Sequence, residues 1–397
     1  MEILFITHKY PPGTGGMEKQ SFELVSRMKA HSKVHLIAIA PKESKLVYFL
    51  ILRKRIISVL TKNPNISIVH FNDGVMASIG LMVYHWKGIL KTATLHGLDI
   101  TFPNSIFRKF LVPRFNKLDL VICVSRFTAE TSVDLGLDRQ KIKVINNGID
   151  HELANSEPNS DEIDQLKNLL GAELSNKKIL LSIGRAVKRK GFSWFIKNIA
   201  SKLPEEYCYV MIGPLQMRSG FHRLLYSVLP SSITSQIDLF LGWADDSQEI
   251  LKYTQSPSFK KRVKHLGKIP YELLVALINQ SYALVMPNIN IEGDAEGFGL
   301  VALEANMKKK IVFASDLQGI RDAVHHNENG ILIETENIDQ WVNTISSSAI
   351  TNEIEERALL FAMNRFSWDK MVSEYYQLFE NLEIQKAKSP TEVLSIS

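Results

Sequence analysis

Hydrophobic and polar residues alternate in blocks along most of the chain. Short runs rich in β-branched and aromatic residues recur, and amphipathic stretches such as 16–30, 74–86 and 126–136 lie between them. A strand that is apolar on both faces must be buried on both faces, so this alternation predicts a parallel sheet covered by helices. The strands predicted for the first part of the chain are 2–7, 33–39, 66–71, 91–96, 119–124 and 142–145.

The pattern restarts after a polar, acidic stretch at 150–176, which contains Pro158. We interpret that stretch as a linker with a flanking helix. The interval 214–266 is long for this alternation. The strands predicted beyond the linker are 177–184, 206–213, 281–287 and 310–315, with 236–243 and 262–267 as further candidates inside the long interval.

The pattern therefore predicts an α/β protein with two doubly wound domains, at residues 1–160 and 161–366. An amphipathic stretch at 367–385 predicts a C-terminal helix, and the residues 386–397 after it are expected to form a disordered tail.

Composition narrows the class of protein. Of the 397 residues 45% are hydrophobic and 22% charged, which is typical of a globular protein. Cys123 and Cys208 lie in apolar runs, so two buried free thiols and a reducing compartment are expected. No run reaches the 18 or so apolar residues of a membrane span, and the N-terminus does not have the pattern of a signal peptide. A cytoplasmic location is therefore expected.

Charge is distributed unevenly. Residues 1–150 hold 21 Lys and Arg against 11 Asp and Glu, whereas the whole chain carries a net charge of +5. The basic, apolar stretches 45–62 and 106–117 lie in this part, and they favour contact with an anionic membrane surface. A core helix with a basic exposed face is the alternative. No basic stretch is interleaved with aromatic residues, so nucleic acid is not an expected partner.

A pair of glycines, Gly15 and Gly16, follows the first predicted strand and precedes a helical stretch. Backbone amides at a helix N-terminus bind anions, and glycine lets the anion approach them. Glu18 stands where a dinucleotide-binding fingerprint needs its third glycine, so that motif is excluded. An ordinary glycine turn remains the alternative.

Two cations, Arg185 and Lys190, follow the predicted strand 177–184. Ligands of open α/β sheets bind beyond the carboxyl ends of the strands. A guanidinium fork and an ammonium point charge suit a diphosphate there. A solvated basic loop is the alternative.

The segment after 281–287 contains two carboxylates, Glu296 and Glu304, and between them the turn Gly297-Phe298-Gly299. A helix starting near residue 300 would present backbone amides at its start and would place Glu304 about one turn inside. Carboxylates suit sugar hydroxyls, and a helix start suits a phosphate or a developing negative charge. An ordinary helix cap with surface acids is the alternative.

One histidine, His96, ends a predicted strand before a glycine, where either a site residue or a structural histidine is expected. Asp294 and Glu296 have no third residue at metal-ligand spacing, so no metal site is expected.

Five segments of the chain resemble, in order, motifs of family 4 of the retaining glycosyltransferases, which have the GT-B fold. The segments are GTGGME (13–18), HGLD (96–99), NNGID (146–150), GRAVKRKG (184–191) and EGFGLVALE (296–304). The last two match the family pattern position for position. The resemblance implies two Rossmann-like domains that face each other across a cleft, with the helix at 367–385 packing back on the N-terminal domain.

The resemblance also implies roles for individual residues. Arg185 and Lys190 would neutralise the leaving diphosphate, Glu296 would contact the donor sugar, and His96 would face that sugar near the reacting carbon. The segment Gly267–Pro270 matches the family's Gly-x-x-Pro, which is expected beside the nucleotide base. The implied nucleotide-binding residues are Gly15, Gly16, Gly184, Lys268, Ile269, Gly297, Phe298, Gly299, Leu300 and Glu304, with Glu304 on the ribose.

The implied activity is retaining transfer of a sugar from a nucleotide diphosphate, with UDP or GDP as the expected nucleotide, and without a metal or other cofactor. The expected acceptor is a glycan or a lipid-linked glycan in cell-surface polysaccharide or glycolipid assembly. A GT-B synthase that acts on soluble sugars and an inactive nucleotide-binding paralogue are the alternatives.

Overall fold

The computed structural model describes residues 1–13, 15–102, 107–215, 234 and 246–388. These residues form two compact units. The first contains residues 1–100, 107–148 and 366–388, and the second contains residues 101–102 and 149–365 with the gaps given above.

The first unit contains a sheet of six parallel strands in the order β2-β1-β3-β4-β5-β6. Each strand overlaps a stretch that the sequence predicts, and its ends differ from the predicted ends by at most two residues. The strands are β1 (Glu2–Thr7), β2 (Lys33–Ala38), β3 (Ile68–Phe71), β4 (Leu90–Leu95), β5 (Leu120–Cys123) and β6 (Ile142–Val144). The longer helices of this unit are α1 (Gly16–Met28), α2 (Lys45–Lys62), α3 (Gly74–Val83), α5 (Arg126–Asp134) and α16 (Trp368–Lys388).

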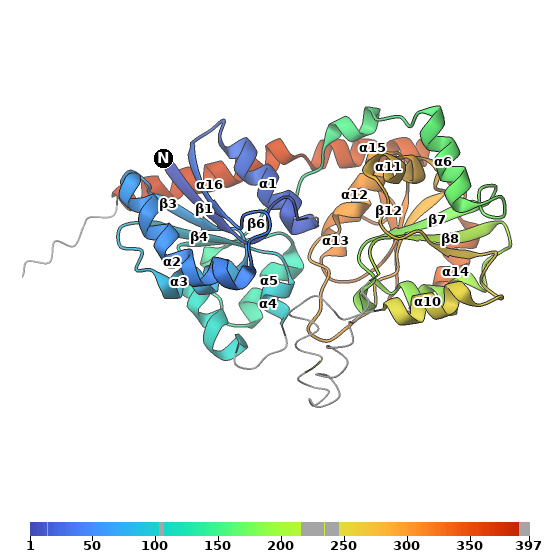
Figure 1. Ribbon diagram of the computed structural model, residues 1–397, viewed down its shortest axis with the longest axis horizontal. Helices are drawn as coiled ribbons and strands as arrows, with labels where there is room; N and C mark the ends of the chain where they lie inside the picture. Colours follow the sequence, from blue (N-terminus) through green and yellow to red (C-terminus); the bar gives the residue numbers. More distant parts are fainter. Residues whose placement is uncertain (14, 103–106, 216–233, 235–245, 389–397) are drawn as a thin grey trace, which may run out of the picture. The chain divides into compact units, whose positions relative to one another are not determined.

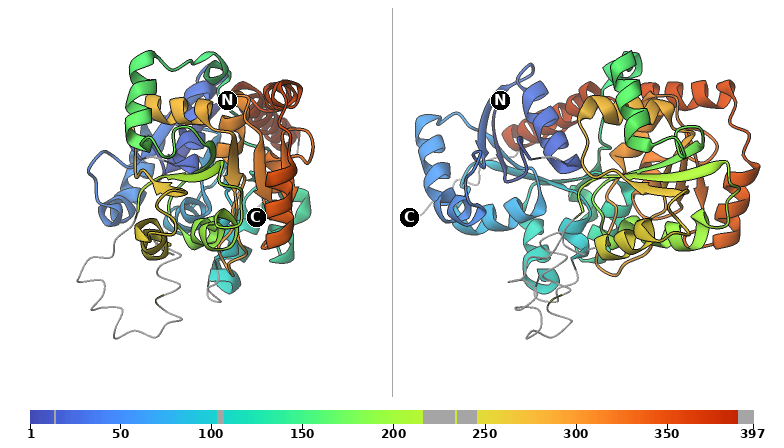
Figure 2. Two further views of the ribbon diagram at one scale, coloured as in Figure 1. Left: turned by 90° about the vertical axis from the view of Figure 1, so that its right-hand side faces the viewer. Right: turned by 45° about the vertical axis from the view of Figure 1, so that its right-hand side comes forward.

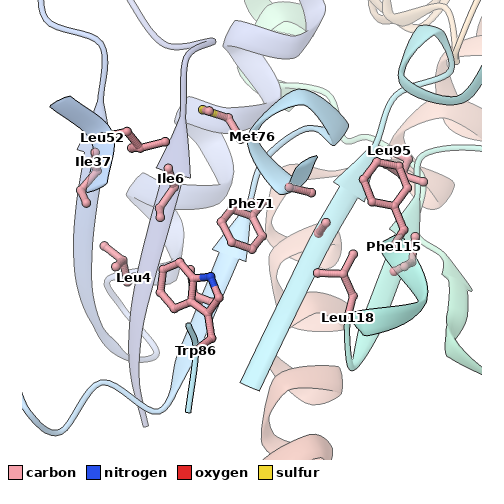
Figure 3. Packing of buried hydrophobic residues seen from close by; sticks show 14 of the residues in the cluster. Leu4, Ile6, Ile37, Leu52, Phe71, Met76, Trp86, Leu95, Phe115 and Leu118 are labelled. Carbon is pink, nitrogen blue, oxygen red and sulfur yellow. The ribbon is translucent and has the colours of Figure 1, made fainter. Parts of the chain in front are cut away.

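Helices lie on both faces of this sheet (Figure 1). Leu4 and Ile6 of β1 point into an apolar cluster with Leu52 of α2 and Met76 of α3 (Figure 3). Successive side chains of a strand point to opposite faces, so Phe5 belongs to the other face, where its ring packs on His70. Burial of both faces explains the continuous apolar run of β1.

A buried polar network fixes the C-terminal helix α16 to this second face. The ring of His70 on β3 bonds to Thr92 Oγ1 at 2.8 Å and to Thr94 Oγ1 at 3.0 Å. Tyr375 Oη of α16 bonds to the same Thr94 hydroxyl at 2.8 Å, and Gln20 Nε2 of α1 donates to Tyr375 Oη at 3.4 Å. Burial lowers the pKa of His70 to about 3, so its ring is neutral at physiological pH. Helix α16 therefore belongs to the first unit, although the whole of the second unit precedes it in the chain.

The second unit also has six parallel strands, in the order β12-β11-β10-β7-β8-β9. The strands are β7 (Lys178–Ile183), β8 (Tyr207–Ile212), β9 (Val263–His265), β10 (Ala283–Met286), β11 (Val312–Ser315) and β12 (Gly330–Ile333). Helices cover this sheet on both faces as well (Figure 2). The longer ones are α6 (Ser160–Leu170), α10 (Ser247–Gln255), α11 (Tyr271–Gln280), α12 (Leu300–Met307), α14 (Ile338–Ser347) and α15 (Asn352–Arg365).

Three expectations need correction or completion. The units divide at Gly148 and not at residue 160. The buried ammonium of Lys308, directly after α12, donates to the carbonyl oxygens of Leu153 and Ser156 and so holds this segment in the second unit. Helix α16 continues to Lys388, so residues 386–388 are not a disordered tail. The edge strand β12 was not predicted from the sequence.

Further expectations concern the long interval 214–266, the two cysteines and membrane spans. The strand candidate 262–267 is confirmed as β9, whereas 236–243 lies outside the described residues. Cys123 and Cys208 are buried free thiols, as expected. Among the described residues, no helix is both long and apolar enough to cross a membrane.

Candidate functional site

The second sheet reverses its strand order between β7 and β10. Strand β7 pairs with β8 on one side and with β10 on the other, so the chain first moves outward to β9 and then crosses back to β10. The loops that leave β7 and β10 at their carboxyl ends therefore diverge to opposite faces. Ligands of open α/β sheets bind at this kind of switch point. The two loops at this position carry Arg185–Lys190 and Asn288–Gly299.

The two loops contact each other through their backbones. Gly191 adopts a left-handed conformation with φ +67°, and a side chain at this position would overlap the carbonyl oxygen of Pro287. Ile289 N donates to the carbonyl oxygen of Arg189 at 3.0 Å. On the far side of the β10 loop, Gly319 N donates to the carbonyl oxygen of Glu296 at 3.1 Å. These contacts set the distance between the cations after β7 and the carboxylates after β10.

An ion cluster joins the two loops at this point. Lys190 Nζ lies 2.6 Å from Glu296 Oε2, and Arg189 Nη1 contacts the same carboxylate oxygen. Arg189 Nε lies 3.0 Å from Asp294 Oδ1, and Asn288 Nδ2 donates to Glu296 Oε2 at 3.3 Å. The structure thus brings Lys190 and Glu296, both site candidates from the sequence, into direct contact.

Burial and charge act against each other on these groups. Burial alone would raise the pKa of Glu296, but Arg189 and Lys190 outweigh it and hold the pKa at about 2. Burial lowers the pKa of Lys190, and the charges of Arg189 and Arg185 lower it as well. Together these effects outweigh Glu296, which raises it. Burial raises the pKa of Asp294 despite its contact with Arg189. Several groups with shifted pKa values near a strand end are typical of a functional site.

A helix starts beside this cluster. Gly299 has a left-handed conformation with φ +102°, and helix α12 begins at Leu300, as the sequence predicts. No side chain among the described residues caps this start, so its amides remain suited to an external anion. Glu304 lies one turn inside α12. Gln318, in the segment after β11, holds the turn, because its Oε1 accepts from Glu296 N at 2.8 Å.

The remaining candidates of this unit lie at the same edge of the sheet. Gly184 lies against the Lys190 stem, since a Cβ added there would be 3.3 Å from Lys190 Cε. Arg185 is exposed and acts electrostatically on Lys190 and Asp294. Lys268 and Ile269 follow β9, where Gly213 N donates to the carbonyl oxygen of Gly267 at 2.9 Å.

The first sheet has a switch point of its own, between β1 and β3. Gly15 precedes α1 and Gly16 begins it, and no described side chain caps this helix. Glu18 Oε2 would lie 2.6 Å from a Cβ on Gly15, and Glu18 also pairs with Lys9 at 3.4 Å. The carboxylate of Glu18 therefore lies against the glycine turn that the sequence identifies as an anion site.

His96 is held in a defined orientation at the end of β4. Its Nε2 bonds to the carbonyl oxygen of Asn72 at 2.8 Å, and its backbone N–H donates to Asp99 Oδ2 at 2.8 Å. At the end of β1, His8 Nδ1 lies 3.1 Å from the buried Asp73 Oδ2. His96 and this His8–Asp73 pair all follow strand ends of the first sheet.

Sequence reasoning missed several polar residues of the second unit. Arg189 was overlooked because it stands between two other cations, so nothing in its spacing separates it from a solvated lysine or arginine. Asn288 and Gln318 are single amides in loops, and only contact across the sheet edge shows their role. Among the described residues, no group of three His, Cys, Asp or Glu side chains could hold a metal ion.

Comparison with protein families covers both units. Residues 14–153 match the model described as Glycosyltransferase Family 4, and residues 171–358 match the model described as Glycosyl transferases group 1. Together the two matches cover all five motif segments, apart from Gly13, the first residue of the first segment. The chain belongs to glycosyltransferase family 4. Its fold is accordingly GT-B, with two Rossmann-like domains.

Several characterised and solved proteins are similar to this family 4 member. An Escherichia coli protein named UDP-Gal:alpha-D-GlcNAc-diphosphoundecaprenol alpha-1,3-galactosyltransferase is 22% identical, over 82% of this chain and 78% of its own. Anabaena HepE in complex with UDP-glucose has a TM-score of 0.69 at 19% identity, over 96% of this chain and 100% of its own. Sucrose-phosphate synthase from Thermosynechococcus elongatus has a TM-score of 0.73 at 18% identity, over 97% of this chain and 99% of its own.

A Klebsiella pneumoniae protein described as an uncharacterized 41.2 kDa protein in the cps region is 23% identical to this chain, over 66% of it. That match spans 62% of the Klebsiella protein, and a match to a Methanocaldococcus jannaschii glycosyltransferase spans 60% of its length. The chain thus spans about three fifths of the length of these two relatives.

The approach of the two loops yields a test of stability. Gly191 and Gly267 have similar left-handed conformations, with φ of +67° and +71°, but only Gly191 has backbone atoms against it. Alanine at either position should cost about 1 kcal/mol for the left-handed backbone. Gly191→Ala should cost a further 1–3 kcal/mol, roughly, because the loops must separate. Urea denaturation of both variants measures the difference, and equal losses would contradict the close loop contact.

Proposed function

We propose that this protein is a retaining glycosyltransferase that moves a sugar from a UDP- or GDP-linked donor to a glycan or lipid-linked acceptor. The observation that carries the proposal is the cluster at the switch point of the second sheet. There Lys190 contacts Glu296, and Arg185 acts electrostatically on Lys190. Helix α12, which has no side-chain cap among the described residues, begins four residues after Glu296. Cations, a carboxylate and helix-start amides are what a sugar diphosphate requires.

The cations act on the leaving group. When the bond between the anomeric carbon and the phosphate oxygen breaks, its electron pair stays on the nucleotide diphosphate and the sugar becomes oxocarbenium-like. Fixed positive charge from Lys190 and Arg185 stabilises this transition state more than the ground state, because the negative charge on the leaving oxygen is still growing. The amides of Phe298, Gly299 and Leu300 add fixed dipoles. These groups supply the charge that a metal ion would otherwise supply, so we propose transfer without a metal or other cofactor.

Retention follows if the acceptor attacks from the face that the diphosphate leaves. The acceptor oxygen then forms the new bond to the anomeric carbon, and its proton passes to the departing phosphate oxygen. We propose that Glu296 accepts hydrogen bonds from sugar hydroxyls, and that Glu304, one turn inside α12, accepts them from the ribose. The proposed base-side residues are Lys268 and Ile269.

The first unit has its own polar groups for this chemistry. The Nε2 of His96 bonds to a backbone carbonyl, which leaves Nδ1 to accept a hydrogen bond from a sugar hydroxyl. We propose His96 as a catalytic residue on this basis, and we propose the turn at Gly15 and Gly16 as an anion-binding element. An anion at that turn requires Glu18 to withdraw from it.

The names of similar proteins support the donor and acceptor classes. One relative is named for transfer from UDP-Gal to a diphosphoundecaprenol-linked sugar, and one solved neighbour contains UDP-glucose. We therefore propose cell-surface polysaccharide or glycolipid assembly as the setting. The structural likeness to a sucrose-phosphate synthase leaves a synthase acting on soluble sugars as the second candidate.

Donor binding is the first test. Isothermal titration calorimetry with UDP-, GDP- and ADP-linked sugars should give binding to a UDP or GDP sugar that persists in EDTA. Product analysis by NMR then reads the anomeric configuration, which should match that of the donor. If no nucleotide sugar binds, the proposed activity is wrong, and an inverted product would reject the retaining mechanism.

The cluster itself is tested by substitution. Lys190→Ala and Glu296→Ala should each reduce turnover by at least about 100-fold, as expected when one transition-state-stabilising group is lost. Lys188→Ala is the matched control, because Lys188 lies in the same turn but is exposed. Steady-state kinetics on folded variants measures the effect. Near-normal turnover in both cluster variants would contradict the site.

Helix α2 provides a surface on which the enzyme can meet a lipid-linked acceptor. Its 18 residues include five Lys and Arg and no Asp or Glu. Tyr48, Leu52 and Ile56 are buried, whereas Leu46 and Leu50 on the opposite side are 68% and 74% exposed. These leucines are four residues apart, so they share one face of the helix.

Basic residues accompany this exposed apolar face. Arg53 and Lys54 are exposed and have no ion pair among the described residues, whereas Arg55 pairs with Glu43 at 2.8 Å. Outside the helix, Lys109 and Phe110 are exposed in the second basic stretch, and Phe110 is 57% exposed. Exposed leucines beside unpaired cations fit an anionic bilayer surface. We therefore propose that the protein docks peripherally on the cytoplasmic face of a membrane.

Vesicle flotation tests this docking. The wild-type protein should float with phosphatidylglycerol-containing vesicles, less so at high salt, and not with neutral ones. Arg53→Glu/Lys54→Glu should weaken binding by at least about tenfold, because each basic residue near the surface contributes about 1 kcal/mol. Lys260→Glu/Lys261→Glu makes the same charge change on exposed lysines of the second unit and should leave binding nearly unchanged. Equal binding by the wild type and the α2 variant would reject the surface.

A further inference from the structure

Arg189 is the residue that connects the two loops of the ion cluster most extensively. It lies in the 3-10 turn Lys188–Lys190, directly before Lys190 in sequence. Its backbone carbonyl accepts from Ile289 N at 3.0 Å, and its Nε lies 3.0 Å from Asp294 Oδ1. The other arm of the guanidinium contacts Glu296 Oε2. One residue thus holds the start, the middle and the end of the segment that leads to Glu296.

Lys190 and Arg189 share the same carboxylate oxygen. Lys190 Nζ lies 2.6 Å from Glu296 Oε2, where Arg189 Nη1 also binds. A lysine engaged with a carboxylate cannot at the same time direct its full charge to a diphosphate. For Lys190 to serve the leaving group, it must loosen its contact with Glu296, and Glu296 must then be held by another charge.

Burial makes that second charge necessary. The side chains of Lys190, Arg189 and Glu296 are 12%, 15% and 12% exposed. A carboxylate this buried without an ion pair becomes protonated, or costs several kcal/mol. Asn288 offers only a neutral hydrogen bond at 3.3 Å, and Asp294 has the same charge as Glu296. Of the charged groups that act on Glu296, Arg189 therefore remains to balance it once Lys190 turns to the donor.

We propose that Arg189 is a positioning residue, which keeps Glu296 ionised and aimed while Lys190 moves from Glu296 to the donor diphosphate. The inference rests on the proposed function for the role of Lys190. A guanidinium suits this task because its planar fork can bind Asp294 with one nitrogen and Glu296 with another. A lysine at this position could pair with only one of the two carboxylates at full strength.

The groups that face Glu296 set the expected pH dependence. Arg189, Lys190 and Asp294 act on it by charge, and Arg185 acts on Lys190 and Asp294. With Arg189 present, the pKa of Glu296 is depressed to about 2, so Glu296 is ionised above that value. Removing Arg189 removes the largest favourable charge contribution, so the pKa must rise and protonation must begin at a higher pH.

The experiment compares Arg189→Gln and Arg189→Lys with Lys188→Gln, which changes an exposed cation in the same turn. In donor-saturated kinetics, Arg189→Gln should lower kcat at least tenfold with a smaller change in KM. The acid limb of its kcat profile should move to higher pH by at least one unit. Arg189→Lys should recover part of both effects, and Lys188→Gln should match the wild type.

A second readout does not depend on turnover. Side-chain carbon NMR of glutamate-labelled protein, assigned with Glu296→Gln, should show Glu296 titrating at higher pH in Arg189→Gln than in the wild type. If the wild type transfers no sugar but this titration shifts, the proposed function fails while the pairing stands. An unchanged titration and pH profile, or a loss confined to KM, would overturn the positioning role. If Arg189→Gln does not fold, an unshifted profile in Arg189→Lys together with wild-type kcat would overturn it as well.

Discussion

The negative charge of Glu296 is the constraint on which the second unit depends. A carboxylate that is 12% exposed cannot remain ionised without cations in contact, and here both cations come from one turn after β7. The carboxylate itself is supplied from the loop after β10. The ion cluster therefore requires that two loops leaving adjacent strands in opposite directions stay within a few ångströms of each other.

Glycines make the approach sterically possible. Gly191 carries the β7 loop past the carbonyl of Pro287, and Gly319 lets the segment after β11 lie against the carbonyls of Glu296 and Gly297. Gly299 takes the left-handed conformation from which α12 begins. As a result Arg189 and Lys190 meet the buried carboxylate of Glu296, and α12 begins four residues later, without a side-chain cap among the described residues. That arrangement, and not any single residue, is the basis on which we propose a sugar-diphosphate site.

The first unit uses neutral hydrogen bonds where the second uses ion pairs. His70, Thr94 and Tyr375 are fully buried and bonded to one another, and the burial that keeps His70 uncharged makes this arrangement stable. Through Tyr375 the network holds a helix that the chain reaches only after completing the second unit. The carboxyl ends of β1, β3 and β4 remain available for His8, Asn72 and His96.

The sequence by itself determined most of the strands and the fold class. It also named Lys190 and Glu296 as candidates, which the structure brings into contact. Buried parallel strands must be apolar on both faces. Among the described residues, β1 through β11 could therefore be predicted from apolar runs in the sequence. The paired motifs around Lys190 and Glu296 identified the family, because their internal spacing is local. The edge strand β12 was not predicted, and the boundary at Gly148 depended on where Lys308 binds.

Only the tertiary structure decided which charges pair. Three consecutive basic residues, Lys188, Arg189 and Lys190, look alike in sequence, yet Lys188 is exposed whereas the other two enter the cluster. Asp294 and Glu296 likewise share a loop but differ in partners and in the direction in which their pKa values shift. The physical reason is that ion pairing depends on distance and burial across the sheet edge. Strand order sets those quantities, and no spacing along the chain contains them.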